Sequence, residues 1–163
     1  MAEPTPFALS RHLSLLIGRK VTFVQATAAV VSKLTQVYGI YNVLPHETAV
    51  VVKADLQVLG AIAGALVGLP APVVKEHLAA ATMDELMRDA IYEVLNVSSA
   101  AVSTEGRAVL TKMVNDPAYI DGAAEQALKN PGHRSYFNVS VEGYPGGRFC
   151  IFSQFVPGGA ERR

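Results

Sequence analysis

The chain opens with a helical pattern of hydrophobic residues and then changes to a β-type pattern. Residues 7–17 place Leu13, Leu16 and Ile17 on one side, and Gly18 follows where helices commonly end. We therefore predict a helix over 7–17. Residues 21–31 are rich in alanine and β-branched residues, which fits a strand or a helix; we favour a strand.

The next segment predicts two strands joined by a turn. Residues 35–43 and 48–54 have the composition of strands, and Leu44-Pro45-His46-Glu47 between them has that of a turn. Asp55 follows the second strand directly. Because an aspartate can accept a hydrogen bond from the first turn of a helix, we expect Asp55 to be an N-cap.

Residues 56–74 contain one polar side chain, Gln57, so a membrane span has to be considered. Pro70 and Pro72 would end a helix after residue 69, well short of the roughly 20 residues that a span requires. Gly60 and Gly64 are spaced to let another element approach closely. We expect a buried helix over 56–69 and no membrane association.

A second long helix is predicted from Thr82 to about Ser103. Thr82-Met-Asp-Glu85 has the form of a capping box, and Gly106 lies just beyond the expected end. The residues expected to face the core are Met87, Ile91, Val94 and Val102.

The last third of the chain predicts a strand, a helix and a hairpin. Residues 108–114 form the strand, Asp116 is a suitable cap, and Pro117 suits the first turn of a helix over 118–129. Alternation over 136–141 and 149–155, with a loop at 142–147, is typical of a β-hairpin. Strands and helices in groups favour an α+β fold, with one domain over 1–156 and a disordered tail at 157–163.

Composition narrows the functional classes. The chain has 163 residues, of which half are hydrophobic, and its 14 Lys and Arg balance its 14 Asp and Glu. No global charge would attract nucleic acid. Cys150 is the only cysteine and lies in a strand-like run, where we expect a packed hydrophobe. With a polar, proline-rich start in place of a signal peptide, a cytoplasmic location is expected.

Common metal and cofactor motifs are missing from the sequence. His12, His46, His77 and His133 are scattered without the spacing of a metal site. The glycines at 143–147 lack the lysine and serine or threonine of a phosphate-binding loop. We therefore expect no metal or cofactor of the protein's own.

One helix face carries the candidate chemistry. Asp89, Glu93 and Asn96 fall within roughly 60° of one another on a helical wheel, opposite the expected core positions. An amide beside a carboxylate can orient a water molecule, and the carboxylate can pair with a cation on a partner. The alternative is that these side chains only solvate the helix.

This pattern resembles the signature of the CheC/CheX/FliY chemotaxis phosphatases. That signature has Asp or Ser, then Glu four residues later, Asn three further, and a proline about twenty-two residues on. Asp89, Glu93 and Asn96 match the first three positions, and Pro117 lies 21 residues past Asn96. The resemblance extends over about residues 34–155 and includes a strand pair, a glycine-rich helix, the signature helix and a closing hairpin.

The resemblance implies a fold and an activity. The fold would be an antiparallel sheet packed against two long helices. Asn96 would orient a water for attack on the phospho-aspartate of a CheY-like response regulator, and Glu93 would contact the regulator's active-site lysine. Asp89 and Pro117 would support the site, and Mg²⁺ would be carried by the regulator.

Two alternatives stay open at this stage. The domain could bind a receiver or flagellar-switch partner without catalysis, through the same helix or an exposed sheet edge. It could also be a structural protein whose helix face is merely solvated. A homodimer, through the hairpin strands for instance, is compatible with the high hydrophobic content.

Overall fold

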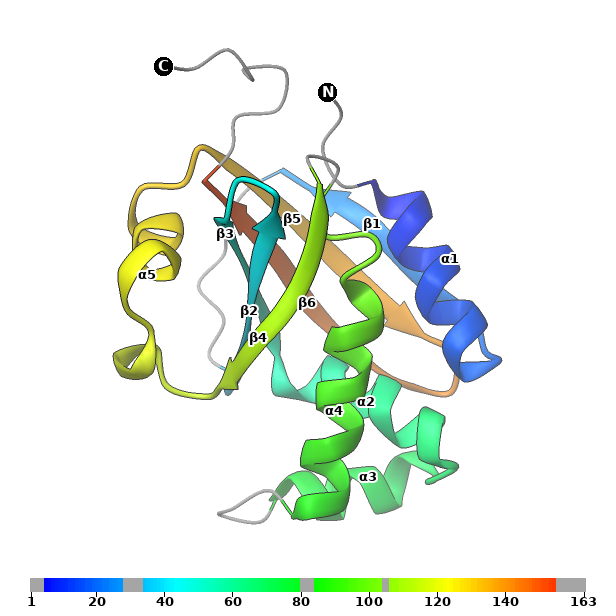
Figure 1. The fold of residues 1–163 in the computed structure, drawn as a ribbon. Coiled ribbons are helices and arrows are strands. Elements are labelled where there is room, and N and C mark those ends of the chain that lie inside the picture. Colours follow the sequence, from blue (N-terminus) through cyan, green and yellow to red (C-terminus); the bar gives the residue numbers. More distant parts are fainter. Residues whose placement is uncertain (1–4, 28–33, 80–83, 104–105, 155–163) are drawn as a thin grey trace.

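Six strands pair into one antiparallel sheet in the computed structural model, which describes residues 5–27, 34–79, 84–103 and 106–154 (Figure 1). Their order across the sheet is β1-β5-β6-β3-β2-β4. The strands are β1 (Val21–Ala26), β2 (Gln36–Leu44), β3 (Thr48–Asp55), β4 (Arg107–Val114), β5 (His133–Val141) and β6 (Tyr144–Ser153). The predicted α+β class and antiparallel sheet are confirmed.

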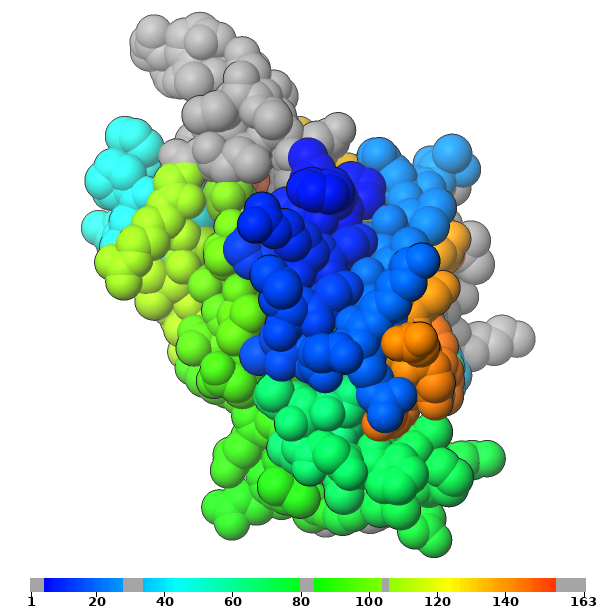
Figure 2. Space-filling view, turned by 90° about the vertical axis from the view of Figure 1, so that its right-hand side faces the viewer, coloured from blue at the N-terminus to red at the C-terminus, as the bar shows by residue number. Residues whose placement is uncertain are grey.

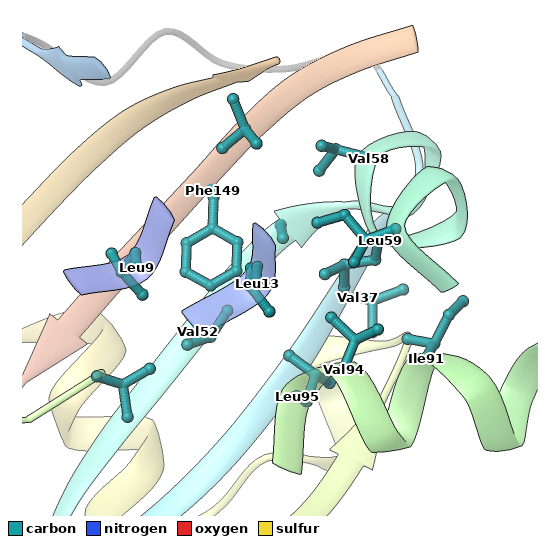
Figure 3. Packing of buried hydrophobic residues seen from close by; sticks show 14 of the residues in the cluster. Leu9, Leu13, Val37, Val52, Val58, Leu59, Ile91, Val94, Leu95 and Phe149 are labelled. Carbon is teal, nitrogen blue, oxygen red and sulfur yellow. The ribbon is translucent and has the colours of Figure 1, made fainter. Parts of the chain in front are cut away.

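Helices cover the two faces of the sheet unequally. The larger face is covered by α1 (Pro6–Ile17), α2 (Leu56–Val67) and α4 (Glu85–Ser98), with α3 (Ala71–Ala79) packed on α2. Figure 3 shows Leu9 and Leu13 of α1 beside Phe149 of the sheet, and Leu95 of α4 near Val52. The smaller core, on the other face, lies beneath α5 (Gly122–Lys129).

The predicted start and end of the signature helix both need correction. Thr82 lies outside the described residues, and the N-cap of α4 is Asp84, whose carboxylate accepts from the Met87 amide at 2.9 Å. The helix ends at Ser98 rather than near Ser103, because the amides of Ser99, Ala100 and Ala101 donate to carbonyls three residues back instead of four. Val102 is nevertheless buried, as its pattern predicted.

The prolines after α2 start a helix that the sequence analysis did not predict. Pro72 occupies the first turn of α3, where a missing N–H costs nothing because that group has no partner inside the helix. The helix α2 itself ends at Val67, before the predicted residue 69, because Gly68 adopts a left-handed φ of 81° and its N–H bonds back to the helix. The prolines therefore begin α3 but do not end α2.

Two other predicted elements have different boundaries. The expected helix over 118–129 is split into a 3-10 turn, Pro117–Tyr119, and α5, because the backbone of Ile120 and Asp121 between them is extended. Gly122, at the start of α5, has a left-handed φ of 61°. The expected loop over 142–147 is mostly strand: Val141 pairs with Tyr144, which leaves Glu142 and Gly143 to make the turn. Phe155 and the tail lie outside the described residues.

Asp55 occupies the expected N-cap position but does not cap α2 with its side chain. Its buried carboxylate accepts from Gln36 Nε2 at 2.6 Å and from the Arg148 backbone N–H at 2.8 Å. These bonds connect the end of β3 to both β2 and β6. The prediction of a capping side chain was therefore wrong, because strand neighbours supply donors that the sequence does not reveal.

Replacing Asp55 by alanine should destabilise the domain strongly. The change removes the acceptor for two part-buried donors, each bond to a charged group contributing about 1.5–3 kcal/mol. We expect a loss of about 2–5 kcal/mol in the free energy of unfolding, measured by urea denaturation. Asp121→Ala is the matched control, since Asp121 also precedes a helix without a side-chain cap bond but is exposed. Equal losses in the two variants would contradict this role.

Candidate functional site

The candidate site lies on α4, and the N-terminal end of this helix is held by an aspartate. One carboxylate oxygen of Asp84 accepts from Met87, and the other contacts Nδ1 of His77 on α3. These interactions lower the pKa of the Asp84 carboxyl, the Met87 amide having the largest effect and His77 the next. The first turn of α4 is thereby connected to the end of α3.

A buried tyrosine holds the other end of α4. The Tyr41 hydroxyl on β2 donates to the Leu95 carbonyl at 2.6 Å, in the last turn where backbone carbonyls lack helical partners. Burial raises the pKa of the Tyr41 phenol far above its ordinary value, so the group stays protonated and remains a donor. Ser98 adds a hydroxyl bond to the Val94 carbonyl at 2.8 Å.

Between these two ends, α4 separates an apolar face from a polar one. Its core face is fully buried, with Met87, Ile91, Val94 and Leu95 all at 0% exposure. Asp89, Glu93 and Asn96 are all exposed on the other side. We call this set of three residues the α4 ridge.

The side chains of the α4 ridge are not used by the fold. Within the part of the chain that the structure describes, Asp89, Glu93 and Asn96 make no side-chain hydrogen bond or ion pair. Positions four and three residues apart on a helix are neighbours on its surface. A carboxylate and a primary amide therefore stand side by side and are free to meet a partner.

Apolar side chains flank the α4 ridge. Leu86 is 49% exposed and Tyr92 is 40% exposed, both on the same helix. Exposed apolar side chains bordered by polar ones are typical of protein-binding surfaces. The hydrophobic pattern did not single out either residue.

The loop that carries Pro117 adjoins α4 at a different height from Asn96. Asn115, just before this proline, lines a small cavity of about 80 Å³ together with Arg88. Arg88 precedes Asp89 in the chain and lies about two helical turns before Asn96. Pro117 itself is exposed and starts the 3-10 turn that Asp116 caps, as expected for a first-turn proline.

Other reactive groups do not form a competing site. Cys150 is half-buried, and burial raises the pKa of its thiol, which suits a packed side chain. Among the described residues, no three His, Cys, Asp or Glu side chains are grouped so that they could hold a metal ion. The α4 ridge thus remains the candidate.

Comparison with known proteins supports the fold. No family model and no curated protein sequence matches the chain. A chain of the FliM–SpeE complex from H. pylori matches in structure with a TM-score of 0.64 at 10% identity, covering 91% of this chain and 80% of that one. The likeness shows that the two chains share a fold.

Two further solved structures agree. FliY of Thermotoga maritima matches with a TM-score of 0.52 at 15% identity, over 89% of this chain and 82% of that one. A putative chemotaxis protein from Desulfovibrio vulgaris Hildenborough matches with a TM-score of 0.50 at 13% identity, over 92% of both chains. The resemblance to the CheC/CheX/FliY type is thus confirmed for the fold, and identities this low carry no residue roles.

The structure also bears on the apolar run over 56–74. In the described part of the chain, no helix combines the length and hydrophobicity needed to cross a membrane. The run is instead divided between α2 and α3, and most of α2 is buried in the core.

Sequence reasoning missed the residues that position the α4 ridge. Tyr41 lies in a strand rich in hydrophobic residues, and no local signal shows that its hydroxyl meets α4. His77 was considered only as a metal ligand. Asp84 was inside the predicted capping box, and aspartate two residues after Thr82 was the available signal for a later helix start.

Removing the Tyr41 hydroxyl should loosen the last turn of α4. Tyr41→Phe keeps the ring but leaves the Leu95 carbonyl without this donor, which should cost about 1–3 kcal/mol. We expect lower stability in urea and faster amide hydrogen exchange over residues 96–100. Tyr119→Phe is the matched control, because Tyr119 is 65% exposed. Unchanged exchange in Tyr41→Phe would rule out the positioning role.

The Asp84 cap should make the stability of the domain depend on pH. Its native pKa lies below the ordinary value of 3.8, so the ionised cap stabilises the fold above that pH. This contribution is lost as the pH falls through the lowered pKa. We expect the difference in melting temperature between wild type and Asp84→Ala to be largest near neutral pH and to shrink below about pH 4. A difference that grows on acidification would contradict this assignment.

Proposed function

We propose that the protein is a phosphatase that acts on the phospho-aspartate of a CheY-like response regulator through the α4 ridge. The observation that carries the proposal is the pairing of an exposed carboxylate and an exposed amide, both without internal partners, on a helix held at both ends. The likeness of the fold to chemotaxis proteins supports it.

Asn96 would supply the attacking water. The oxygen of a primary amide can accept a hydrogen bond from a water while its NH2 group donates to another atom, so the amide can orient the water without acting as a strong base. The water oxygen attacks phosphorus in line, the bond from phosphorus to the aspartate oxygen breaks, and inorganic phosphate and a free carboxylate result. Such reactions ask the protein mainly for positioning.

Glu93 would fix the position of the regulator on α4. Its carboxylate, one turn from Asn96, is placed to pair with a cation, and the family resemblance points to the regulator's active-site lysine. Mg²⁺ and the phosphoryl group would both belong to the regulator, so the chain needs no metal of its own. Asp89 would add charge at the start of the α4 ridge, while Pro117 would help shape the loop near Arg88.

Removal of the Asn96 amide tests the proposal. We expect Asn96→Ala to reduce stimulated dephosphorylation of a CheY-like regulator roughly 100-fold, since the loss of correct positioning has effects of that order. The readout is the decay of radiolabelled phospho-regulator in the presence of Mg²⁺. Alanine favours helix, so folding should be unaffected.

Matched variants make the test specific. Asn138→Ala removes an exposed amide from β5 and should leave the rate unchanged, as should Glu85→Gln in the first turn of α4. Glu93→Gln should weaken regulator binding and lower the rate. If Asn96→Ala dephosphorylates as fast as wild type, the catalytic mechanism is wrong.

A second candidate is a binding domain without turnover. The likeness to a chain of the FliM–SpeE complex favours it, because that structure is an assembly of proteins. On this alternative, the α4 ridge with Leu86 and Tyr92 would bind a receiver or switch partner. Binding that is weakened by Glu93→Gln, with no effect of the protein on phosphate lifetime, would support the adaptor. Homodimerisation remains a prediction, which sedimentation equilibrium can check.

A further inference from the structure

A second site lies apart from the α4 ridge, where α2, α3 and the β5–β6 hairpin meet. A groove of about 660 Å³ lies between the start of α2, the side of α3, the chain entering β2 and the tip of the β5–β6 hairpin. The residues that define it are Leu34, Leu56, Gln57, Lys75, Leu78 and Pro145. None of them belongs to the α4 ridge.

The hairpin wall of this groove is held by two hydrogen bonds to the α2 region. The Tyr144 hydroxyl donates to the Leu69 carbonyl at 2.6 Å, and Gln57 Nε2 donates to the Gly146 carbonyl at 2.7 Å. Figure 2 shows the hairpin tip, in orange, directly above the green α2–α3 region. Pro145 lies between these two anchored residues, so its ring is held in place.

The α3 wall is held by close helix packing. A Cβ atom on Gly64 would lie 2.1 Å from Val74 Cγ2, and one on Gly60 would lie 2.4 Å from Leu78 Cδ1. Only glycine permits this approach, so α3 sits against α2 at a fixed distance. The third wall is fixed as well, because the Leu56 amide donates to the Thr35 carbonyl at 2.7 Å.

The chemistry of the lining is apolar with one charge. Leucine, proline and alanine side chains supply most of it, and Lys75 is the single ionisable residue among the described residues that line the groove. The amide of Gln57 still has an acceptor oxygen, since its nitrogen is used by Gly146. An occupant would therefore meet apolar walls and one cation at the rim.

We propose that this groove binds a small amphipathic carboxylate, with its apolar body against α2, α3 and Pro145 and its acid group at Lys75. The volume lies in the range of pockets that hold small molecules, roughly 300–1,000 Å³. Pre-positioned walls reduce the ordering cost of binding. The positive charge of Lys75 selects an anion over a neutral or cationic head group.

The test uses decanoate and decan-1-ol as probes, below the concentrations at which either self-associates. Binding is followed by NMR through the methyl groups of Leu34, Leu56 and Leu78. Wild type should bind decanoate roughly two- to fivefold more tightly than decan-1-ol, the range expected for an exposed ion pair. Lys75→Gln should remove this preference and leave the binding of the alcohol unchanged.

A filled groove provides the second arm of the test. Ala71→Phe, at the start of α3, should weaken binding of both probes at least about tenfold, since the ring occupies the space of the apolar body. Lys129→Gln, on α5 beyond the other face of the sheet, is the control for charge and should change nothing. Because Lys75 is exposed, its substitution tests the site even if Ala71→Phe folds poorly.

Three results would contradict the proposed ligand site. If neither probe shifts the groove methyl signals, or if Lys75→Gln retains the preference for decanoate, the proposal is wrong. Methyl shifts spread over the whole core would indicate general loosening of the fold and would equally overturn it. None of these results depends on phosphatase activity, so this site and the proposed function fail or stand separately.

Discussion

The hydrogen bond from the Tyr41 hydroxyl to the Leu95 carbonyl is the contact on which the arrangement of the candidate site depends. Burial of the apolar face of α4 keeps the helix on the sheet, at about 1.5–3 kcal/mol for each large side chain as an upper value. Apolar contacts, however, allow a helix to slide or rotate slightly. A short hydrogen bond between a rigid strand and the last helical turn specifies one position for the helix. Asn96 directly follows Leu95, so this bond also fixes the position of Asn96.

The side chains of the α4 ridge, in contrast, make no hydrogen bond or ion pair with the residues that the structure describes. The core is complete without Asp89, Glu93 and Asn96, and the capping of the helix is done by Asp84 and Tyr41. Positioning and chemistry are thus assigned to different residues. A site that is to enter a partner's pocket requires this separation, because side chains bonded within the domain would have to break those bonds first.

The walls of the groove formed by α2, α3 and the β5–β6 hairpin are also fixed by contacts within the domain. Glycines in α2 bring α3 close, and the hairpin tip is bonded to α2 at Leu69 and Gln57. Val74 and Leu78 of α3 pack against these glycines, and both also line the groove. The α2–α3 unit is therefore held together by the same side chains that form one wall of the groove. It is connected to α4 through the His77–Asp84 contact.

What could be read from the sequence follows from local periodicity. Composition predicted β2 and β3, alternation predicted the β5–β6 hairpin, and an apolar run predicted α2. Helical spacing predicted α1 and α4, with Met87, Ile91 and Val94 buried. The exposure of Glu93 and Asn96 follows from the same spacing, since a helix that buries one face must present the other. These results depend on residues that are near one another in the chain.

Tertiary structure alone decided the rest, because it depends on partners that are distant in sequence. The carboxylate of Asp55 turned from its helix to donors on β2 and β6, and Tyr41 met α4 across 54 positions. Gly68 ended α2, and the prolines that follow it began α3. The sequence by itself therefore determined which side chains α4 exposes, whereas the fold determined how firmly the helix is held and where the groove beside α3 opens.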